Sequence, residues 1–147
     1  MITVNPRRVA FLAVVCASLA ALAESPAYHR LTKIPTPKII AAAEAFRGGG
    51  WEAENVLNPI GALTEYASNG KSVQTFVDFD FGQATSVAAF RHVQRRWPDT
   101  IAEAVLVFSD SPDFAAAKAT VKVHHVDESQ AVTFATFEPV AARYVRW

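Results

Sequence analysis

The residues best suited to bind a ligand lie close together between positions 91 and 100. Two guanidinium groups, an indole ring and a carboxylate come from Arg95, Arg96, Trp97 and Asp99. This mixture suits a sugar, because an aromatic face packs against C–H groups while planar charged groups exchange hydrogen bonds with hydroxyls. The alternative is structural: an Arg–Asp ion pair would clasp the loop, with Trp97 folded onto the edge of the domain.

Two carboxylates also share one face of an alternating segment, at Asp78 and Asp80. Such a pair could serve in catalysis, but solvation on a sheet surface is the simpler interpretation, with Asp80 anchoring the loop after Gly82. The sequence contains no nucleophile elbow, phosphate-binding loop or paired catalytic histidine. We therefore expect no enzyme activity and no catalytic residue.

The histidines give little support for a metal site. His124 and His125 are adjacent in a predicted strand, so their side chains point to opposite faces and do not hold one ion together. A site that combines one of them with His92 or Asp127 is the alternative. We expect no metal ligand.

The elements that must position these residues are short strands, because apolar and polar side chains alternate with a period of two. In the clearest segment, residues 72–83, Val77, Phe79 and Phe81 share one face, and Gly82 is expected to end the strand. Further strands are predicted at residues 87–94, 103–109, 120–126, 131–137 and 142–147, with turns at residues 110–113, 127–129 and 138–139.

Helical structure is scarce in the pattern. Residues 39–46 are ambiguous between a helix and a first strand, and residues 54–57 are expected to form one helical turn before Pro59. Many short strands without long helices between them indicate an antiparallel β-sandwich or barrel. Since residues 143–147 are strand-like to the last position, we expect a fragment or a shortened gene product that lacks its last strand.

The N-terminal segment has the order of a secretory signal. Basic Arg7 and Arg8 precede an apolar run over residues 9–22, and the small residues Ala21 and Ala23 occupy the positions that a signal peptidase reads. A membrane anchor is the alternative, but the run is shorter than the ~20 residues that span a bilayer. We expect cleavage after residue 23, no membrane span afterwards, and a secreted, periplasmic or cell-envelope location.

The chain left after cleavage reads as one domain. Residues 24–37 form a proline-containing leader, and residues 38–147 form the domain. The only cysteine, Cys16, lies in the signal, so the domain has no disulfide. Since the signal holds two arginines and no acid, 12 basic and 14 acidic side chains remain, a balance that does not favour nucleic acid as a partner.

Five segments occur in an order typical of one protein family: WEAENVLN at 51–58, TEYAS at 64–68, VDFDFG at 77–82, LVFSD with DF at 106–110 and 113–114, and RYVRW at 143–147. Together they resemble the discoidin domain, also called the coagulation-factor type C domain, which is galactose-binding-like and related to the family 32 carbohydrate-binding modules. The resemblance covers about residues 39–147.

The resemblance implies a jelly-roll β-sandwich with its loops gathered at one end, where ligands bind. It also implies that Trp51 and Tyr66 pack inside. Many members hold a structural calcium ion, but Asn58 and Pro59 replace the aspartate and glycine of that loop here. Calcium gains from charged oxygen ligands, so we expect no cofactor, with calcium as the alternative.

The sequence thus predicts a secreted, non-catalytic module that binds a carbohydrate or cell-surface glycan through Arg95, Arg96, Trp97 and Asp99. The alternative is a structural or protein-interaction β-sandwich domain of a larger extracellular or cell-envelope protein.

Overall fold

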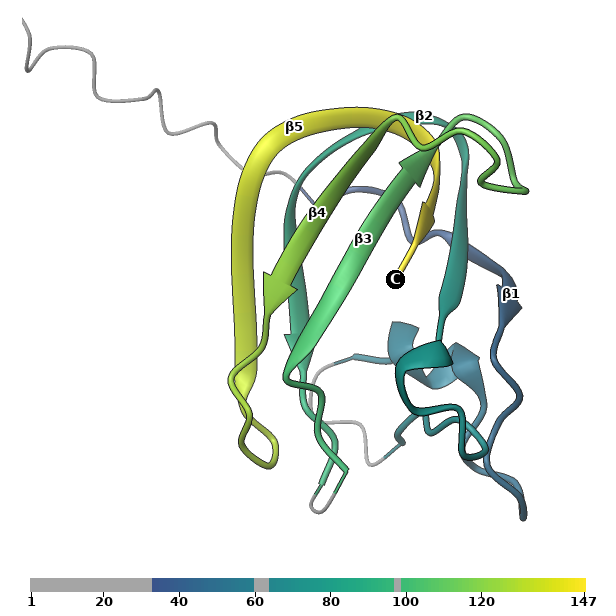
Figure 1. The fold of residues 1–147 in the computed structure, drawn as a ribbon, viewed down its shortest axis with the longest axis vertical. Coiled ribbons are helices and arrows are strands. Elements are labelled where there is room, and N and C mark those ends of the chain that lie inside the picture. The colour runs from purple at the N-terminus through teal and green to yellow at the C-terminus, as the bar shows by residue number, and fades with distance from the viewer. Residues whose placement is uncertain (1–32, 60–63, 97–98) are drawn as a thin grey trace, which may run out of the picture. The chain divides into compact units, whose positions relative to one another are not determined.

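Two long strands, β2 and β5, organise the computed structural model, which describes residues 33–59, 64–96 and 99–147. Among these residues, five strands form one sheet in the order β1-β2-β5-β3-β4, and each neighbouring pair is antiparallel (Figure 1). The elements are β1 (Lys38–Ala42), the 3-10 helices η2 (Ala53–Leu57) and η3 (Ser72–Gln74), β2 (Val77–Val93), β3 (Glu103–Ser109), β4 (Ala119–His124) and β5 (Val132–Arg146).

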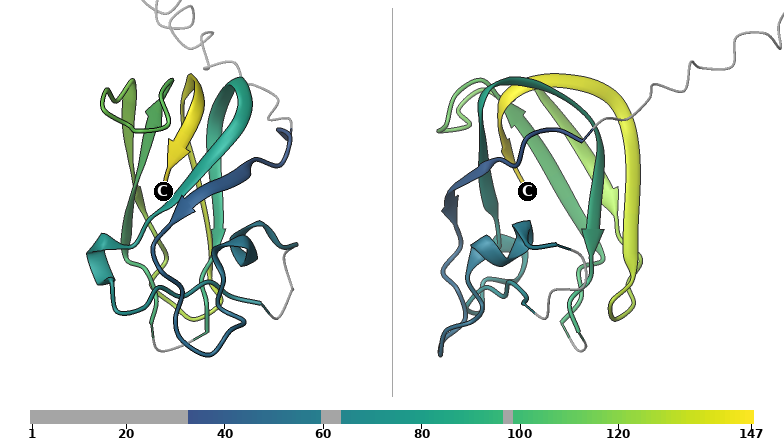
Figure 2. Two further views of the ribbon diagram at one scale, coloured as in Figure 1. Left: turned by 90° about the vertical axis from the view of Figure 1, so that its right-hand side faces the viewer. Right: turned by 180° about the vertical axis from the view of Figure 1, so that it is seen from behind.

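Both long strands bend, so that each contributes to two layers of a sandwich (Figures 1 and 2). The pairing of β2 with β5 shifts register after Asp80 and again after Val87. Gly82 lies in the first irregular stretch with a φ of 77°, a conformation that residues with a Cβ rarely adopt. Because the pairing resumes beyond each shift, one pair of strands runs through both layers.

Two strand boundaries predicted from the sequence are wrong. Gly82 bends β2 instead of ending it, as glycine often does at a bulge. The predicted strands at 131–137 and 142–147 are a single strand, β5, which continues through Pro139. Proline is tolerated there because the register shifts between Thr136 and Val140, so the missing N–H is not required by a regular ladder.

The remaining strand predictions agree with the structure more closely. The strand at 103–109 is confirmed at its predicted bounds as β3, and the expected helical turn at 54–57 is confirmed as η2. The ambiguous segment 39–46 contains the strand β1 and no helix. The predicted antiparallel all-β architecture is confirmed.

The core lies between the strands of the compact unit Lys33–Trp147. Full burial of one large aliphatic or aromatic side chain contributes about 1.5–3 kcal/mol. Phe108 of β3 has no exposed surface and packs edge-on against Phe137 with ring centroids 5.9 Å apart. The buried cluster comprises Val87, Leu106, Phe108, Val123, Ala142 and Val145.

Asp78 is buried and paired, which corrects the prediction that it is solvated. Asp78 of β2 and Arg146 of β5 are direct cross-strand partners. Nε and Nη2 of Arg146 donate to the two carboxylate oxygens at 2.7 and 2.8 Å, which raises the pKa of Arg146. The guanidinium also lies over the rings of Phe76 and Phe114, at 4.8 and 4.6 Å from their centroids. Alternation in one strand predicts the face of a carboxylate but not the partner that the next strand supplies.

Asp80 joins the bend in β2 to β5. Nε and Nη2 of Arg143 donate to its carboxylate at 2.9 and 3.0 Å. The N–H of Gly82 donates to Asp80 Oδ1 at 2.6 Å, which confirms the predicted anchoring role. The hydrogen bond from Arg143, followed by that from Gly82, lowers the pKa of Asp80 to about 2. The carboxylate therefore remains ionised at neutral pH.

Replacing Asp78 with Asn should lower the free energy of unfolding by about 1.5–3 kcal/mol, because the buried side chain at this position loses its charge-assisted hydrogen bonds with the partly exposed Arg146. Urea unfolding at neutral pH measures this change. The control is Asp110→Asn, which removes one partner of the exposed ion pair with Lys118 and should change stability by less than about 1 kcal/mol. Equal losses in the two variants would contradict a special role for the buried pair.

Candidate functional site

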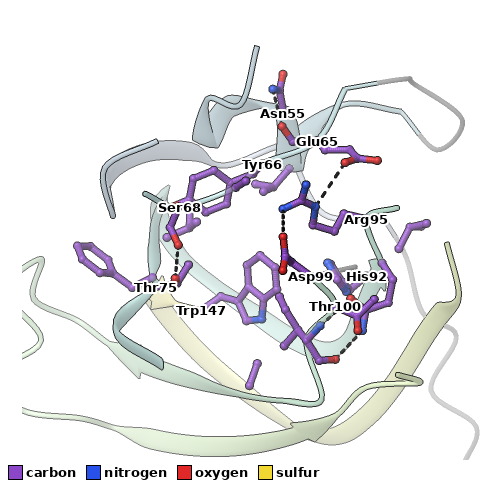
Figure 3. Close-up of a pocket in the computed structure, with 18 of the residues that line it drawn as sticks. Asn55, Glu65, Tyr66, Ser68, Thr75, His92, Arg95, Asp99, Thr100 and Trp147 are labelled. Carbon is purple, nitrogen blue, oxygen red and sulfur yellow. Dashed lines mark hydrogen bonds and ion pairs between the residues drawn. The ribbon is translucent and has the colours of Figure 1, made fainter. Parts of the chain in front are cut away.

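A hollow of about 1840 Å³ is lined by residues of η2, η3 and the β2–β3 and β4–β5 connections. These segments gather at one end of the sandwich (Figures 1 and 2). Figure 3 shows a close-up of this pocket, with polar side chains from several segments pointing into it. Its lining includes Trp51, Glu65, Tyr66, His92, Arg95 and Trp147. The gathering of loops at one end agrees with the arrangement that the family resemblance implies.

Arg95 lines this hollow and contacts residues from three segments. Its Nε is 3.5 Å from Glu65 Oε2, and its Nη1 is 3.6 Å from Asp99 Oδ2 (Figure 3). Its Cζ lies 5.1 Å from the centroid of the Trp51 ring, within cation–π range. We call Trp51, Glu65, Arg95 and Asp99 the clasp.

The guanidinium of Arg95 makes no hydrogen bond to the described residues. Both ion-pair distances exceed hydrogen-bond length, and Nε is buried without an acceptor. By contrast, Arg143 and Arg146 each donate two hydrogen bonds of 3.0 Å or less to a single carboxylate. Buried donors are nearly always paired in folded proteins, so a buried Arg95 Nε without an acceptor among the described residues is unusual.

Glu65 belongs to the clasp although the sequence did not identify it. Its Oε1 accepts a hydrogen bond from the N–H of Arg96 at 3.0 Å. Asn55 Nδ2 donates to the carbonyl oxygens of Glu65 and Gly50, each at 2.9 Å. The Asn55 side chain therefore ties the backbone at Glu65 to the backbone at Gly50. No local sequence pattern predicts the contact of Glu65 with Arg95, because the two residues are far apart in the chain.

The four residues predicted to bind ligand have different environments. Arg95, Arg96 and Asp99 all line the hollow, but they differ in exposure. The side chain of Asp99 is 76% exposed, and that of Arg96 is 57% exposed, with its Nε 3.9 Å from Glu65 Oε1. Trp97 lies outside the described residues. The structural alternative raised by the sequence is present in the Arg95–Asp99 ion pair, and the ligand-binding role of the four residues remains a prediction.

Trp51 and Tyr66, expected in the core, are only half-buried and both line the hollow. The Tyr66 hydroxyl donates to the carbonyl oxygen of Ala43 at 2.9 Å, and burial raises the pKa of Tyr66. Trp51 packs edge-on against Phe46 with ring centroids 6.5 Å apart. Each ring therefore has a structural contact on one side while it also borders the hollow.

Three aromatic residues, His92, His125 and Trp147, pack against one another near this end of the sandwich, and His92 and Trp147 line the hollow. The ring centroid of His92 lies 4.8 Å from that of His125 and 4.9 Å from that of Trp147. Four buried nitrogen atoms have no hydrogen-bond partner in the described part of the chain: His92 Nδ1, both ring nitrogens of His125 and Trp147 Nε1. Desolvation, with a smaller effect of His125, lowers the pKa of His92 to about 4, so its ring is neutral at pH 7.

Within the described residues, no group of three or more His, Cys, Asp or Glu side chains is placed to hold a metal. His124 is exposed while His125 is buried, as their adjacent positions in the sequence predict. Asn58, at the loop where relatives of the resembled family hold calcium, donates its amide to Thr64 Oγ1 at 2.7 Å. The side-chain amide of Asn58 is therefore used in a contact within the protein. In the same ranges, no helix has the length and apolar character needed to cross a membrane.

Stability should fall as the pH is lowered, because burial keeps His92 neutral in the folded state. An unfolded histidine takes up its proton near pH 6.5, whereas folded His92 does so at about 4, so the stabilisation is full above this window and is lost through it. The loss across the window is on the order of 3 kcal/mol, because a difference of one in pKa corresponds to about 1.4 kcal/mol. Urea unfolding across the window measures it.

His92→Gln should flatten part of this pH dependence, whereas the control, His124→Gln, alters an exposed ring and should leave it unchanged. Asp80 titrates lower, with a pKa of about 2, and contributes mainly below the window. Identical pH profiles for both variants would show that burial of His92 has no such effect.

The comparisons with known proteins concern the fold. No protein-family model matches this chain. No curated protein matches it either. Several solved structures share its architecture. Chitosan-binding module 1 of a chitosanase/glucanase from Paenibacillus sp. IK-5 gives a TM-score of 0.52 at 17% sequence identity, covering 76% of this chain and 80% of the module.

A second module of that enzyme, solved in complex with chitotriose, gives a TM-score of 0.50 at 20% identity, covering 76% of this chain and 81% of the module. The family 32 carbohydrate-binding module (CBM32) of AlyQ, in complex with 4,5-unsaturated mannuronic acid, gives 0.47 at 20% identity, covering 80% of this chain and 83% of that one. The chain has the antiparallel β-sandwich fold of carbohydrate-binding modules.

Proposed function

We propose that this protein is a non-catalytic carbohydrate-binding module whose ligand occupies the hollow beside the clasp. The observation that carries the proposal is Arg95, a half-buried guanidinium that faces a hollow without one hydrogen bond to the described residues. The fold supports it, because the solved modules that share this architecture bind chitosan or chitotriose. Sequence identity of 17–20% shows a shared fold but not a shared ligand, so the kind of sugar depends on the residues of the site itself.

The chemistry of the clasp suits a ligand rich in hydroxyl groups. The N–H groups of Arg95 can donate to hydroxyl oxygens, and the carboxylates of Glu65 and Asp99 can accept from hydroxyl protons. Trp51 lies beneath the guanidinium and borders the same hollow, where its ring offers an apolar face to C–H groups. Arg96 and Asp99, both exposed, extend the contact surface outward, and Trp97 keeps the stacking role that the sequence predicts.

Secretion is part of the same proposal. The predicted signal at residues 1–23 lies outside the described residues, and it motivates a site of action outside the cytoplasm. A secreted glycan-binding module would there meet polysaccharides or cell-surface glycans.

A second candidate function is binding to another protein. Phe134 is 59% exposed and Val132 is 45% exposed, and the two lie on the same face of β5 because they are two residues apart. Exposed apolar side chains that gather on one face mark interaction surfaces in many proteins. A pull-down from the secreted fraction, compared with a Phe134→Ser variant, would separate this activity from glycan binding.

Replacing Arg95 with Gln should weaken glycan binding by roughly 10- to 100-fold, because a charge-assisted hydrogen bond contributes about 1.5–3 kcal/mol. A glycan array identifies a ligand, and isothermal titration calorimetry then measures the affinity of each variant. Lys118→Gln is the control, since it removes one positive charge from the β3–β4 connection at the opposite end of the sandwich (Figure 1). Binding that is equally strong in both variants, or no binding to any glycan, would refute the proposal.

Replacing Trp97 with Ala should weaken glycan binding while the domain stays folded, because the proposed role of this ring is stacking on the ligand. The unfolding midpoint in urea and the affinity are measured on the same sample. A cooperative loss of structure would instead assign Trp97 to the core.

A further inference from the structure

The charges of the clasp are unevenly satisfied. Both carboxylates, of Glu65 and Asp99, lie within ion-pair distance of Arg95, and Glu65 also accepts from the N–H of Arg96. The guanidinium of Arg95 has no hydrogen bond to the described residues, and the side chain of Arg96 lies 3.9 Å from Glu65. The clasp therefore has donor groups available, while its acceptors already face cations.

The two carboxylates differ in how firmly they are held. Glu65 is 17% exposed and receives the backbone hydrogen bond from Arg96, with its own backbone tied down by Asn55. Asp99 is 76% exposed, and its Oδ2 lies 3.6 Å from Nη1 of Arg95. An exposed ion pair at this distance contributes between 0 and about 1 kcal/mol. Asp99 can therefore be displaced from Arg95 at little cost, whereas Glu65 stays in place.

We propose that the clasp selects acidic sugars, with the carboxylate of a uronic acid taking the position beside Arg95 that Asp99 occupies in the free protein. This inference rests on the proposed carbohydrate-binding function and specifies the class of sugar. A carboxylate matches the planar guanidinium because two parallel N–H groups can donate to its two oxygens. The carboxylate oxygens of the ligand thereby supply hydrogen-bond acceptors that the described residues do not offer to Arg95.

The same arrangement disfavours a cationic amino sugar. An ammonium group would need a carboxylate, and both carboxylates of the clasp already face Arg95. Placing the ammonium beside Arg95 and Arg96 would also bring like charges together, which is unfavourable. A neutral sugar lies between these cases, because its hydroxyls accept hydrogen bonds from Arg95 without adding charge attraction.

The test compares three oligosaccharides of similar length by isothermal titration calorimetry at about pH 6, where a uronate is ionised and an amino sugar is protonated. The probes are trigalacturonate, its neutral counterpart galactotriose, and deacetylated chitotriose as the cationic amino sugar. We expect trigalacturonate to bind most tightly and chitotriose least. The affinity for trigalacturonate should also fall with added salt, because the exposed edge of the clasp is screened.

Asp99→Asn gives the sharpest readout, because the proposal requires this loss of a carboxylate to improve binding. Freeing Arg95 from its ion pair should raise the affinity for trigalacturonate by about two- to fivefold. Asp110→Asn is the matched control, since it removes another exposed carboxylate from an ion pair at the other end of the sandwich and should have no effect. Arg95→Lys keeps the charge but loses the planar pair of donors, so it should bind trigalacturonate more weakly than the wild type.

The outcomes distinguish this inference from the function on which it rests. Weaker trigalacturonate binding by Asp99→Asn, or tighter binding of chitotriose than of trigalacturonate, would overturn the inference. If galactotriose and trigalacturonate bind equally and both depend on Arg95, the sugar-binding function stands and the selection for acidic sugars fails. If none of the three oligosaccharides binds, the inference is refuted, and the glycan array decides whether the sugar-binding function stands.

Discussion

The structure depends on the antiparallel pairing of two bent strands, β2 and β5, and on the ion pairs that join them. Asp78 binds Arg146 and Asp80 binds Arg143, each through two hydrogen bonds. Both acids lie just before the first register shift, so the straight part of the ladder is fixed next to the bend. With β2 and β5 held in this way, β1 and β3 pair on their outer edges, and the sandwich encloses its core.

Arginines serve two purposes in this domain, and their hydrogen bonds tell them apart. Arg143 and Arg146 are satisfied by carboxylates of the neighbouring strand, so their role in the fold is complete without a ligand. Arg95 lies over Trp51 and beside two carboxylates, yet its guanidinium has no hydrogen bond to the described residues. An unsatisfied polar group in a native structure often marks a functional site, because the missing partner arrives from outside.

Much of the fold could be predicted from the sequence, because a two-residue alternation is local information. It located β3 at its bounds and the antiparallel architecture as a whole. It failed at Gly82 and Pro139, since a residue that ends a strand in one context forms a bulge where a partner strand continues beyond it. It also misplaced Asp78, because the partner that allows its burial, Arg146, lies 68 residues further along the chain.

The site shows the same limit more sharply. Arg95 and Asp99 are close in sequence, so their types and spacing identified them, but Glu65 comes from a segment before β2 and meets Arg95 only when the sandwich closes. The core cluster and the cross-strand ion pairs involve residues other than the clasp. Because the core and the cross-strand ion pairs stabilise the fold, the loop end tolerates an Arg95 guanidinium without hydrogen bonds to the described residues and an exposed Asp99 carboxylate. Since the residues that stabilise the fold are separate from those around the hollow, the ligand class depends on the side chains of the site and not on the fold.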